Sequence, residues 1–277
     1  MTVRRLWLIA DDYSLSPGVS EAILHLLVEG RLSGTGCMTL FPEWPEAARQ
    51  LREAPRGAAI GLHLTLTDQM ALSGRSVLAP EGRLPSLGQL LLRTAGNRQV
   101  AHAVIRELDL QYELFVEAMG RAPDFVDGHQ HVHFLPVVRR WFADLVQRAA
   151  PHPVPFVRGA PALAYAPNAV LAKAAFVRGM ARGFDRSLRA AGLHVVGPLA
   201  GFYDWRDDRA FAAVLERGVA ALPDDSVFMC HPGNVDDLLE LRDGLRAPRT
   251  IEFEYLRSRS FTEALERSDT AIATIER

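Results

Sequence analysis

The sequence predicts an α/β protein whose parallel strands form a barrel within a single domain, residues 1–277. Short apolar segments alternate with longer amphipathic segments, which is the pattern of strands connected by covering helices. The length of 277 residues is close to the roughly 250 residues of an α/β barrel. Acidic, arginine and histidine residues recur at the ends of the apolar segments, where such sheets carry their active sites. We favour a barrel over an open sheet because a barrel brings all strand ends to one mouth.

The first half of the chain begins with a strand and a well-marked helix. Leu6–Ala10 has the composition of a buried strand. Ser16 supplies a helix cap and Pro17 a first-turn proline, so we expect a helix from there to Glu29, ending at a glycine. Thr67–Ser86 contains turn formers without sustained periodicity, which predicts a long functional loop. The other expected strands are Thr35–Leu40, Ala58–Leu64 and Asp124–Asp127, and the other expected helices are Trp44–Glu53 and Val100–Met119.

The second half continues the same alternation. Val170–Ala190 is expected to be one long arginine-bearing helix. This helix could cover the site or touch a lipid headgroup, although a solvated helix face explains its arginines more simply. The other expected elements are helices at Val137–Arg148 and Asp208–Ala220, strands at Val154–Arg158, His194–Val196 and Ser226–Cys230, and a last strand near Ala271–Ile275 after a helical remainder.

Composition narrows the function classes. The formal charge of −2 and the pI near 6.5 argue against a protein that binds nucleic acid electrostatically. The two cysteines, Cys37 and Cys230, are far apart and lack metal-ligand spacing, so we expect reduced, buried thiols in a cytoplasmic protein. The N-terminal apolar run is too short for a signal peptide. No segment approaches the ~20 apolar residues of an integral membrane span.

Three histidines lie within five residues directly after a short apolar run. In an extended segment, His129, His131 and His133 would point to the same side, because alternate residues share a face. Imidazole is the commonest protein metal ligand and titrates near neutral pH, so the cluster indicates a metal site or proton transfer. A polar strand end whose histidines bind water and backbone is the alternative.

Similar chemistry recurs at other predicted strand ends. Carboxylates, imidazoles and a guanidinium each follow an apolar run closely, and in a parallel barrel these positions converge. The residues in these positions are Asp11, Asp12, His63, His129, Arg158 and His231.

Four segments together resemble the signatures of the YdjC-like carbohydrate deacetylases. Ile9–Ser16 resembles their "ADDFGLS" opening, Gly61–Thr65 their second signature, Asp127–His133 their D-x-H-x-H-x-H signature and Met229–Gly233 their late HPG. The segments follow the family order over most of the chain. Ser14 stands where the family usually has glycine, which can alter the adjacent loop without removing a ligand. The family includes chitooligosaccharide deacetylases and deacetylases associated with hopanoid biosynthesis.

The resemblance implies a distorted TIM-like (β/α) barrel that holds one divalent metal ion. By motif position, Asp12, His63 and His129 correspond to the metal ligands, Asp11 to the general base and His231 to the general acid. The residue chemistry agrees, because one carboxylate and two imidazoles leave coordination positions open for water and substrate. Nitrogen-rich ligation favours Zn²⁺ or another late divalent ion, whereas Mg²⁺ is often associated with this family.

The same residues also have structural explanations. Adjacent aspartates such as Asp11 and Asp12 often cap loops or helices. A histidine within an apolar strand, such as His63, is often a buried core residue with satisfied hydrogen bonds. The agreement of several strand ends favours the metal site.

Further residues are expected around the ligands. Asp127 could hold a ligand histidine through its other ring nitrogen, and His131 and His133 could orient a ligand or shape the pocket. Arg158 could keep Asp11 ionised or bind a substrate oxygen, and a surface salt bridge is the alternative.

Aromatic residues near the site could bind a sugar ring. Tyr13, Phe202, Tyr203 and Trp205 could form a stacking platform, although aromatic side chains are more often core. We expect Phe202–Trp205 and the Thr67–Ser86 loop to line the barrel mouth.

These expectations lead to a metal-dependent hydrolase that removes the N-acetyl group from an N-acetylhexosamine unit, oligomeric or lipid-linked, and releases acetate. A two-metal phosphoesterase or another amidohydrolase on a related barrel, and a noncatalytic carbohydrate-binding protein, are the alternatives. The expected partner is a small acetylated sugar, with no nucleic acid and no integral membrane span. A homodimer is compatible with the sequence.

Overall fold

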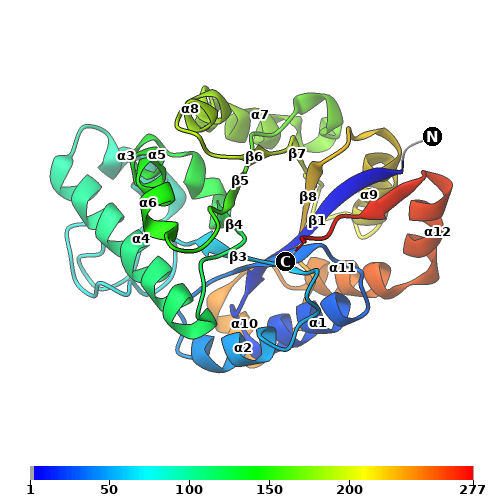
Figure 1. Ribbon diagram of the computed structural model, residues 1–277, viewed down its shortest axis with the longest axis horizontal. Helices are drawn as coiled ribbons and strands as arrows, with labels where there is room; N and C mark the ends of the chain where they lie inside the picture. Colours follow the sequence, from blue (N-terminus) through cyan, green and yellow to red (C-terminus); the bar gives the residue numbers. More distant parts are fainter. Residues whose placement is uncertain (1–2, 277) are drawn as a thin grey trace.

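The computed structural model describes residues 3–276, which form a curved parallel sheet surrounded by helices (Figure 1). All strand pairings among the described residues are parallel. The strand order is β6-β5-β4-β3-β2-β1-β8-β7, and β9 pairs with β1. The strands are β1 (Arg4–Tyr13), β2 (Gly34–Cys37), β3 (Ala59–Leu64), β4 (Phe125–Gly128), β5 (Phe156–Arg158), β6 (Val195–Val196), β7 (Leu199–Ala200), β8 (Ser226–Cys230) and β9 (Thr270–Ile272).

The sheet curls so that the two ends of its strand order approach each other. An isolated parallel bridge between Pro161 and Leu199 connects the segment after β5 to β7. The strands are unequal, since β1 has ten residues whereas β6 and β7 have two each. The α/β class and the distorted TIM-like barrel predicted from the sequence are therefore confirmed.

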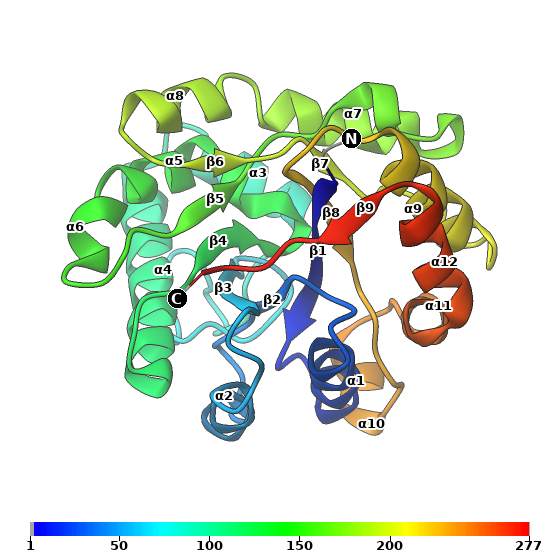
Figure 2. The same ribbon diagram turned by 45° about the vertical axis from the view of Figure 1, so that its right-hand side comes forward.

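Helices surround the strands on their outer side (Figure 2). Because helices and loops cover both faces, the strands are almost continuously buried, as is typical of parallel sheets. The helices, including the short 3₁₀ segments η1–η3, are α1 (Pro17–Val28), α2 (Trp44–Leu51), α3 (Leu87–Thr94), α4 (Arg98–Met119), η1 (His129–Phe134), α5 (Pro136–Ala143), α6 (Leu145–Ala149), η2 (Leu163–Tyr165), η3 (Asn168–Val170), α7 (Leu171–Met180), α8 (Phe184–Ala190), α9 (Ala210–Ala221), α10 (Asp237–Arg242), α11 (Ala247–Arg257) and α12 (Arg259–Arg267).

Helix α1 forms for the reasons expected from its sequence. The Ser16 side chain accepts a hydrogen bond from the backbone N–H of Val19, and Pro17 occupies the first turn. Gly30 follows with φ +66°, a left-handed conformation that glycine adopts without a steric cost.

The single helix predicted over Val170–Ala190 is wrong. The chain instead forms α7 and α8, because Gly183 adopts φ +73° between them and interrupts the helix. The helix predicted over Val137–Arg148 is likewise divided into α5 and α6, at Asp144. In both cases the apolar periodicity continues past a break in the backbone.

Among the strands and α-helices, β7 and α3 were not predicted, and neither were the short 3₁₀ segments η2 and η3. Helix α3 begins immediately after the predicted long loop with a capping box, in which Ser86 and Gln89 exchange side-chain and backbone hydrogen bonds. This capping box was a readable signal in the sequence. Both cysteines are buried and unpaired, as expected. Among the described residues, no helix combines the length and apolar composition needed to cross a bilayer.

Candidate metal and catalytic site

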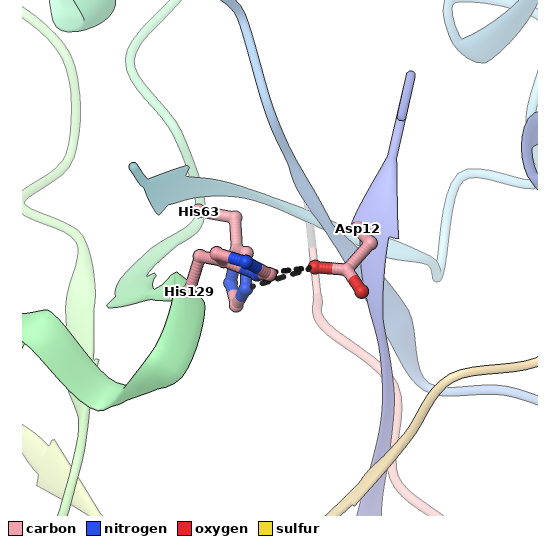
Figure 3. Close-up of side chains that lie close together, drawn as sticks. All are labelled: Asp12, His63 and His129. Atoms are coloured by element: carbon pink, nitrogen blue, oxygen red, sulfur yellow. Dashed lines mark hydrogen bonds and ion pairs between the residues drawn. The ribbon is translucent and has the colours of Figure 1, made fainter. Parts of the chain in front are cut away.

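Asp12, His63 and His129 converge from three different strand ends (Figure 3). Oδ1 of Asp12 lies 3.4 Å from Nε2 of His63 and 3.0 Å from Nδ1 of His129. One potential ligand atom from each residue lies within 4.8 Å of the others. Asp12 and His63 are buried and His129 is half-buried, so the cluster lies at the inner end of a cavity rather than on the surface.

An irregularity at the end of β1 allows consecutive aspartates to line the same cavity. In a regular strand, Asp11 and Asp12 would point to opposite faces. The register between β1 and β2 shifts between Ala10 and Tyr13, and Asp12 adopts φ +71°. Both carboxylates line the cavity as a result.

The predicted arrangement of the three clustered histidines is wrong. Strand β4 ends at Gly128, and His129–Phe134 forms a 3₁₀ turn in which Gln130 and His131 have φ values of +49° and +61°. Gly128 permits this tight turn, since a Cβ there would lie 3.0 Å from the backbone nitrogen of His133. The three imidazoles therefore do not share one side.

Only His129 of the three reaches Asp12. His131 lines the cavity, and burial, His133 and the Arg158 guanidinium hold its pKa well below the ordinary range. His133 is buried, and its ring centroid lies 3.9 Å from that of Phe134. Within residues 3–276, the potential metal-holding groups include neither His131 nor His133.

Asp127 lies behind His63 on the side away from Asp12. Its Oδ1 is 2.6 Å from Nδ1 of His63. A carboxylate in this position holds a proton on Nδ1 and directs the Nε2 lone pair to a metal. Burial opposes protonation of His63, but Asp127 and Asp11 outweigh it and raise the pKa of His63 to about 10.

Arg158 binds the carboxylate of Asp11 with both terminal nitrogens, at 2.8 and 2.5 Å. Its side chain is 1% exposed and also contacts Asp127. A surface salt bridge, one of the alternatives considered for Arg158, is therefore excluded. The bidentate contact fixes Asp11 at the edge of the cavity.

Arg158 also distinguishes between two possible metal-holding groups. The second group consists of Asp11, His63 and Asp127. Arg158 contacts both of its carboxylates. The group of Asp12, His63 and His129 fits a cation better, because Oδ1 of Asp12 faces two imidazole nitrogens. Its one oxygen and two nitrogens are a donor set suited to a divalent ion with open positions.

His231 follows β8 directly, and β8 pairs with β1, the strand that carries Asp11. Its Nε2 is 4.0 Å from Oδ2 of Asp11, and its Nδ1 is 3.8 Å from Oε1 of Glu252. The backbone N–H of His231 donates to Glu252, and the hydroxyl of Tyr203 donates to Glu252 at 2.5 Å. Burial opposes protonation of His231, but Glu252 and Asp11 raise its pKa above the ordinary value.

Arg249 holds the second oxygen of Asp12. Its Nη2 donates to Oδ2 of Asp12 at 2.7 Å and to Asp243 at 2.5 Å. Burial opposes ionisation of Asp12, but Arg249 and His129 outweigh it and hold the pKa of Asp12 well below its ordinary value. Asp12 is therefore a carboxylate at neutral pH.

Arg249 and Glu252 were not predicted from the sequence to belong to the site. They lie on α11, whose buried residues are spaced like one helical face. Two charged residues at positions of this helix that would face the core were the sequence signal for a buried role. The buried residues of this face are Arg249, Glu252, Phe253 and Leu256.

The site opens into a cavity of about 520 Å³. Asp11, Asp12, His63, His129, His131 and His231 line its polar part. Lys173 and Phe176 of α7 form another wall together with Trp205, so part of the arginine-bearing segment covers the site. Lys173 Nζ lies 3.8 Å from the centre of the Trp205 ring.

Three of the four aromatic residues predicted to form the platform are absent from the described lining residues, and one of them, Phe202, is buried. Tyr13 is buried in the core, and its hydroxyl donates to the backbone carbonyl of Ala47. Tyr203 is buried as well and acts on the site only through Glu252. Trp205, which is 40% exposed, is the one member of the proposed platform among the described lining residues.

The Thr67–Ser86 loop lies beside the cavity rather than around its mouth. Among the described lining residues, none comes from this loop. Asp68 accepts a hydrogen bond from Gln130, which does line the cavity. The loop is fixed to α4, because buried Glu107 accepts hydrogen bonds from the backbone N–H groups of Leu72 and Ser73.

This chain is similar to several proteins of known name. A chitooligosaccharide deacetylase of Citrobacter koseri is 26% identical over 95% of this chain and 94% of its own length. A chitooligosaccharide deacetylase of Enterobacter is 34% identical, over 47% of this chain and only half of its own length. The mouse carbohydrate deacetylase is 33% identical over 52% of this chain and 47% of its own length.

The fold also has a counterpart among solved structures. An Enterococcus faecalis protein to which cellobiose-phosphate cleavage has been attributed is 21% identical, with a TM-score of 0.73 over 98% of this chain and 97% of its own. The sequence profile of the YdjC-like protein family matches residues 5–267 of this chain. This match extends over nearly the whole barrel, and the chain therefore belongs to the YdjC-like protein family.

Proposed function

We propose that the chain is a metal-dependent carbohydrate N-deacetylase, acting as one catalytic domain on an N-acetylhexosamine unit. The observation that carries the proposal is the meeting of Asp12, His63 and His129 with Asp11 and His231 in one cavity. The names of the relatives, chitooligosaccharide and carbohydrate deacetylase, supply the reaction and substrate class.

In this proposal Asp12, His63 and His129 hold one divalent ion. Such an ion would polarise the amide carbonyl and lower the pKa of the attacking water. Asp127 keeps the proton on Nδ1 of His63, so that Nε2 is available as a ligand. Arg249 binds the other oxygen of Asp12 and orients the carboxylate.

Asp11 accepts a proton from water as the water attacks the acetyl carbon. Arg158 holds both oxygens of Asp11 and thereby fixes the base in position. His231 then donates a proton from Nε2 to the sugar nitrogen as the C–N bond breaks. The raised pKa of His231 keeps this donor protonated near neutral pH. Acetate and a free amino sugar are the products.

An acetate-release assay tests this function. Chelator-treated protein should be inactive and should regain activity on N-acetylglucosamine oligomers when Mg²⁺ or Zn²⁺ is added. The ion that restores more activity identifies the metal. Asp11→Asn keeps the shape of the side chain but removes its basicity, so turnover should fall by about 10²–10⁴ while metal binding is retained. Full activity after verified metal removal would contradict the proposal, and so would release of acetate only from amides other than sugars.

The two alternative functions predict different results when the same purified protein is assayed. A phosphoesterase on a related barrel would carry two metal ions per chain and would hydrolyse phosphate esters. A noncatalytic protein would bind the sugars without releasing acetate. Metal content per chain and acetate release therefore separate the three functions.

A further inference from the structure

The solvent-facing side of α7 is apolar. Ala174 and Val177 face the core, and the opposite side of a helix normally carries polar residues. Here Leu171 is 39% exposed and Phe176 is 51% exposed. At 3.6 residues per turn, five exposed residues fall on this side. They are Leu171, Ala172, Ala175, Phe176 and Gly179.

Neighbouring segments extend this apolar side. Segment η2 packs against α7 and contributes Leu163, which is 37% exposed. Trp205, which is 40% exposed, lies next to Lys173 of α7. We call the exposed side of α7 together with Leu163 and Trp205 the α7 surface. It runs along the outer edge of the molecule together with α8 (Figure 2) and meets the cavity at Phe176 and Trp205.

Basic residues border the α7 surface. Lys173 and Arg178 are exposed and lie on the two flanks of the apolar side. Arg182, Arg186 and Arg189 follow on the turn and on α8. The sequence contains no acidic residue from 159 to 184. The border of α7 itself therefore carries only positive charge, whereas Asp185 at the start of α8 and Asp204 beside Trp205 add negative charge at its two ends.

We propose that the α7 surface binds the headgroup region of a bilayer that contains anionic lipids. An apolar helix side flanked by lysine and arginine is the arrangement by which helices lie in a membrane interface. The cationic border would be attracted to anionic headgroups. A second copy of the chain is a poorer occupant, because a two-fold contact would bring two cationic borders together. This binding does not depend on the reaction catalysed in the cavity.

Vesicle sedimentation with the full chain tests the apolar part of this surface. The protein should sediment with phosphatidylcholine vesicles that contain about 30% phosphatidylglycerol and much less with phosphatidylcholine alone. Leu171→Asp combined with Ala175→Asp should lower the partition coefficient by about tenfold or more, because burying a carboxylate in the interface is unfavourable. Leu92→Asp is the matched control, since Leu92 is an 80% exposed leucine on α3.

A second pair of variants tests the charge without risk to folding. Arg178→Gln should lower partitioning about fivefold, the effect expected for one basic residue near an anionic surface. Arg217→Gln, an exposed arginine on α9, should have no effect. Added salt should weaken binding of the wild type.

Three results would overturn the proposal. Failure of the wild type to sediment with the anionic vesicles is the first. An equal loss of binding in Leu92→Asp or Arg217→Gln would show that the α7 surface is not the contact. A lipid-free dimer that Leu171→Asp and Ala175→Asp dissociate would show that a second copy covers this surface.

Discussion

Replacing Asp127 with asparagine removes the carboxylate that lies behind His63. Asp127 is fully buried, its Oδ1 lies 2.6 Å from Nδ1 of His63, and its other oxygen contacts Arg158. The asparagine oxygen can still accept from Nδ1, but without a full negative charge. Its amide nitrogen must then face the Arg158 guanidinium, donor against donor. We expect a folded protein with weaker metal binding.

The geometry allows the two effects to be estimated separately. A carboxylate behind a metal-ligating histidine is typically worth 10–100-fold in metal affinity, or about 1.4–2.8 kcal/mol. Breaking a buried ion pair completely costs about 3–5 kcal/mol. Arg158 keeps its bidentate contact with Asp11, so the free energy of unfolding should fall by only about 1–3 kcal/mol, the cost of an unsatisfied buried group.

Competition with a chromophoric chelator measures the metal affinity, and urea unfolding of the metal-free protein measures the stability. Asp109→Asn is the matched control, because Asp109 accepts hydrogen bonds from Trp141 and Arg148 away from the cavity. This control should lose stability but keep wild-type metal affinity. Unchanged metal affinity in a folded Asp127→Asn protein would refute the role of the Asp127 carboxylate in metal binding.

Three further predictions concern the pH dependence and the substrate. Because the pKa of His63 is raised to about 10, metal binding at pH 8 should release a proton, seen by calorimetry in buffers of different ionisation enthalpy. The metal-free protein should lose the stability contributed by His63 as pH rises from about 6.5 through about 10, and a free energy of unfolding that stays constant over this range would contradict this. Glu252→Gln should move the alkaline limb of the rate profile to lower pH, because Glu252 raises the pKa of His231; an unmoved limb would assign the acid elsewhere. Trp205→Ala should raise KM more than it lowers kcat, since stacking holds ground state and transition state alike, and an unchanged KM would exclude a stacking role.

The parts of the site that the sequence predicted are those determined locally. Asp12, His63 and His231 each follow an apolar run, and the carboxyl ends of parallel strands converge whatever the details of the loops. Strand β8 was predicted to the residue for the same reason, since a short apolar run with turn formers on both sides has one interpretation.

The parts that were not predicted depend on contacts between distant segments. Gln130 and His131 adopt left-handed conformations in the turn after β4, and period-two alternation gives no warning of such a turn. Arg249 reaches Asp12 across 237 positions of sequence. The break at Gly183 was visible as a glycine, but a glycine within a periodic helix can also be tolerated.

The buried charges link the proposed binding of a divalent cation at this site to the release of a proton. Four acidic side chains and two guanidiniums are buried around the site, so acidic groups outnumber the guanidiniums in a region of low dielectric. In the metal-free protein the raised pKa values of His63 and His231 supply two positive charges by protonation. A divalent ion bound to His63 would displace the proton from Nε2. The ion would also bring two positive charges where the proton brought one. Metal affinity and His63 protonation must therefore oppose each other. The groups that enter this balance are Asp11, Asp12, Asp127, Glu252, Arg158 and Arg249.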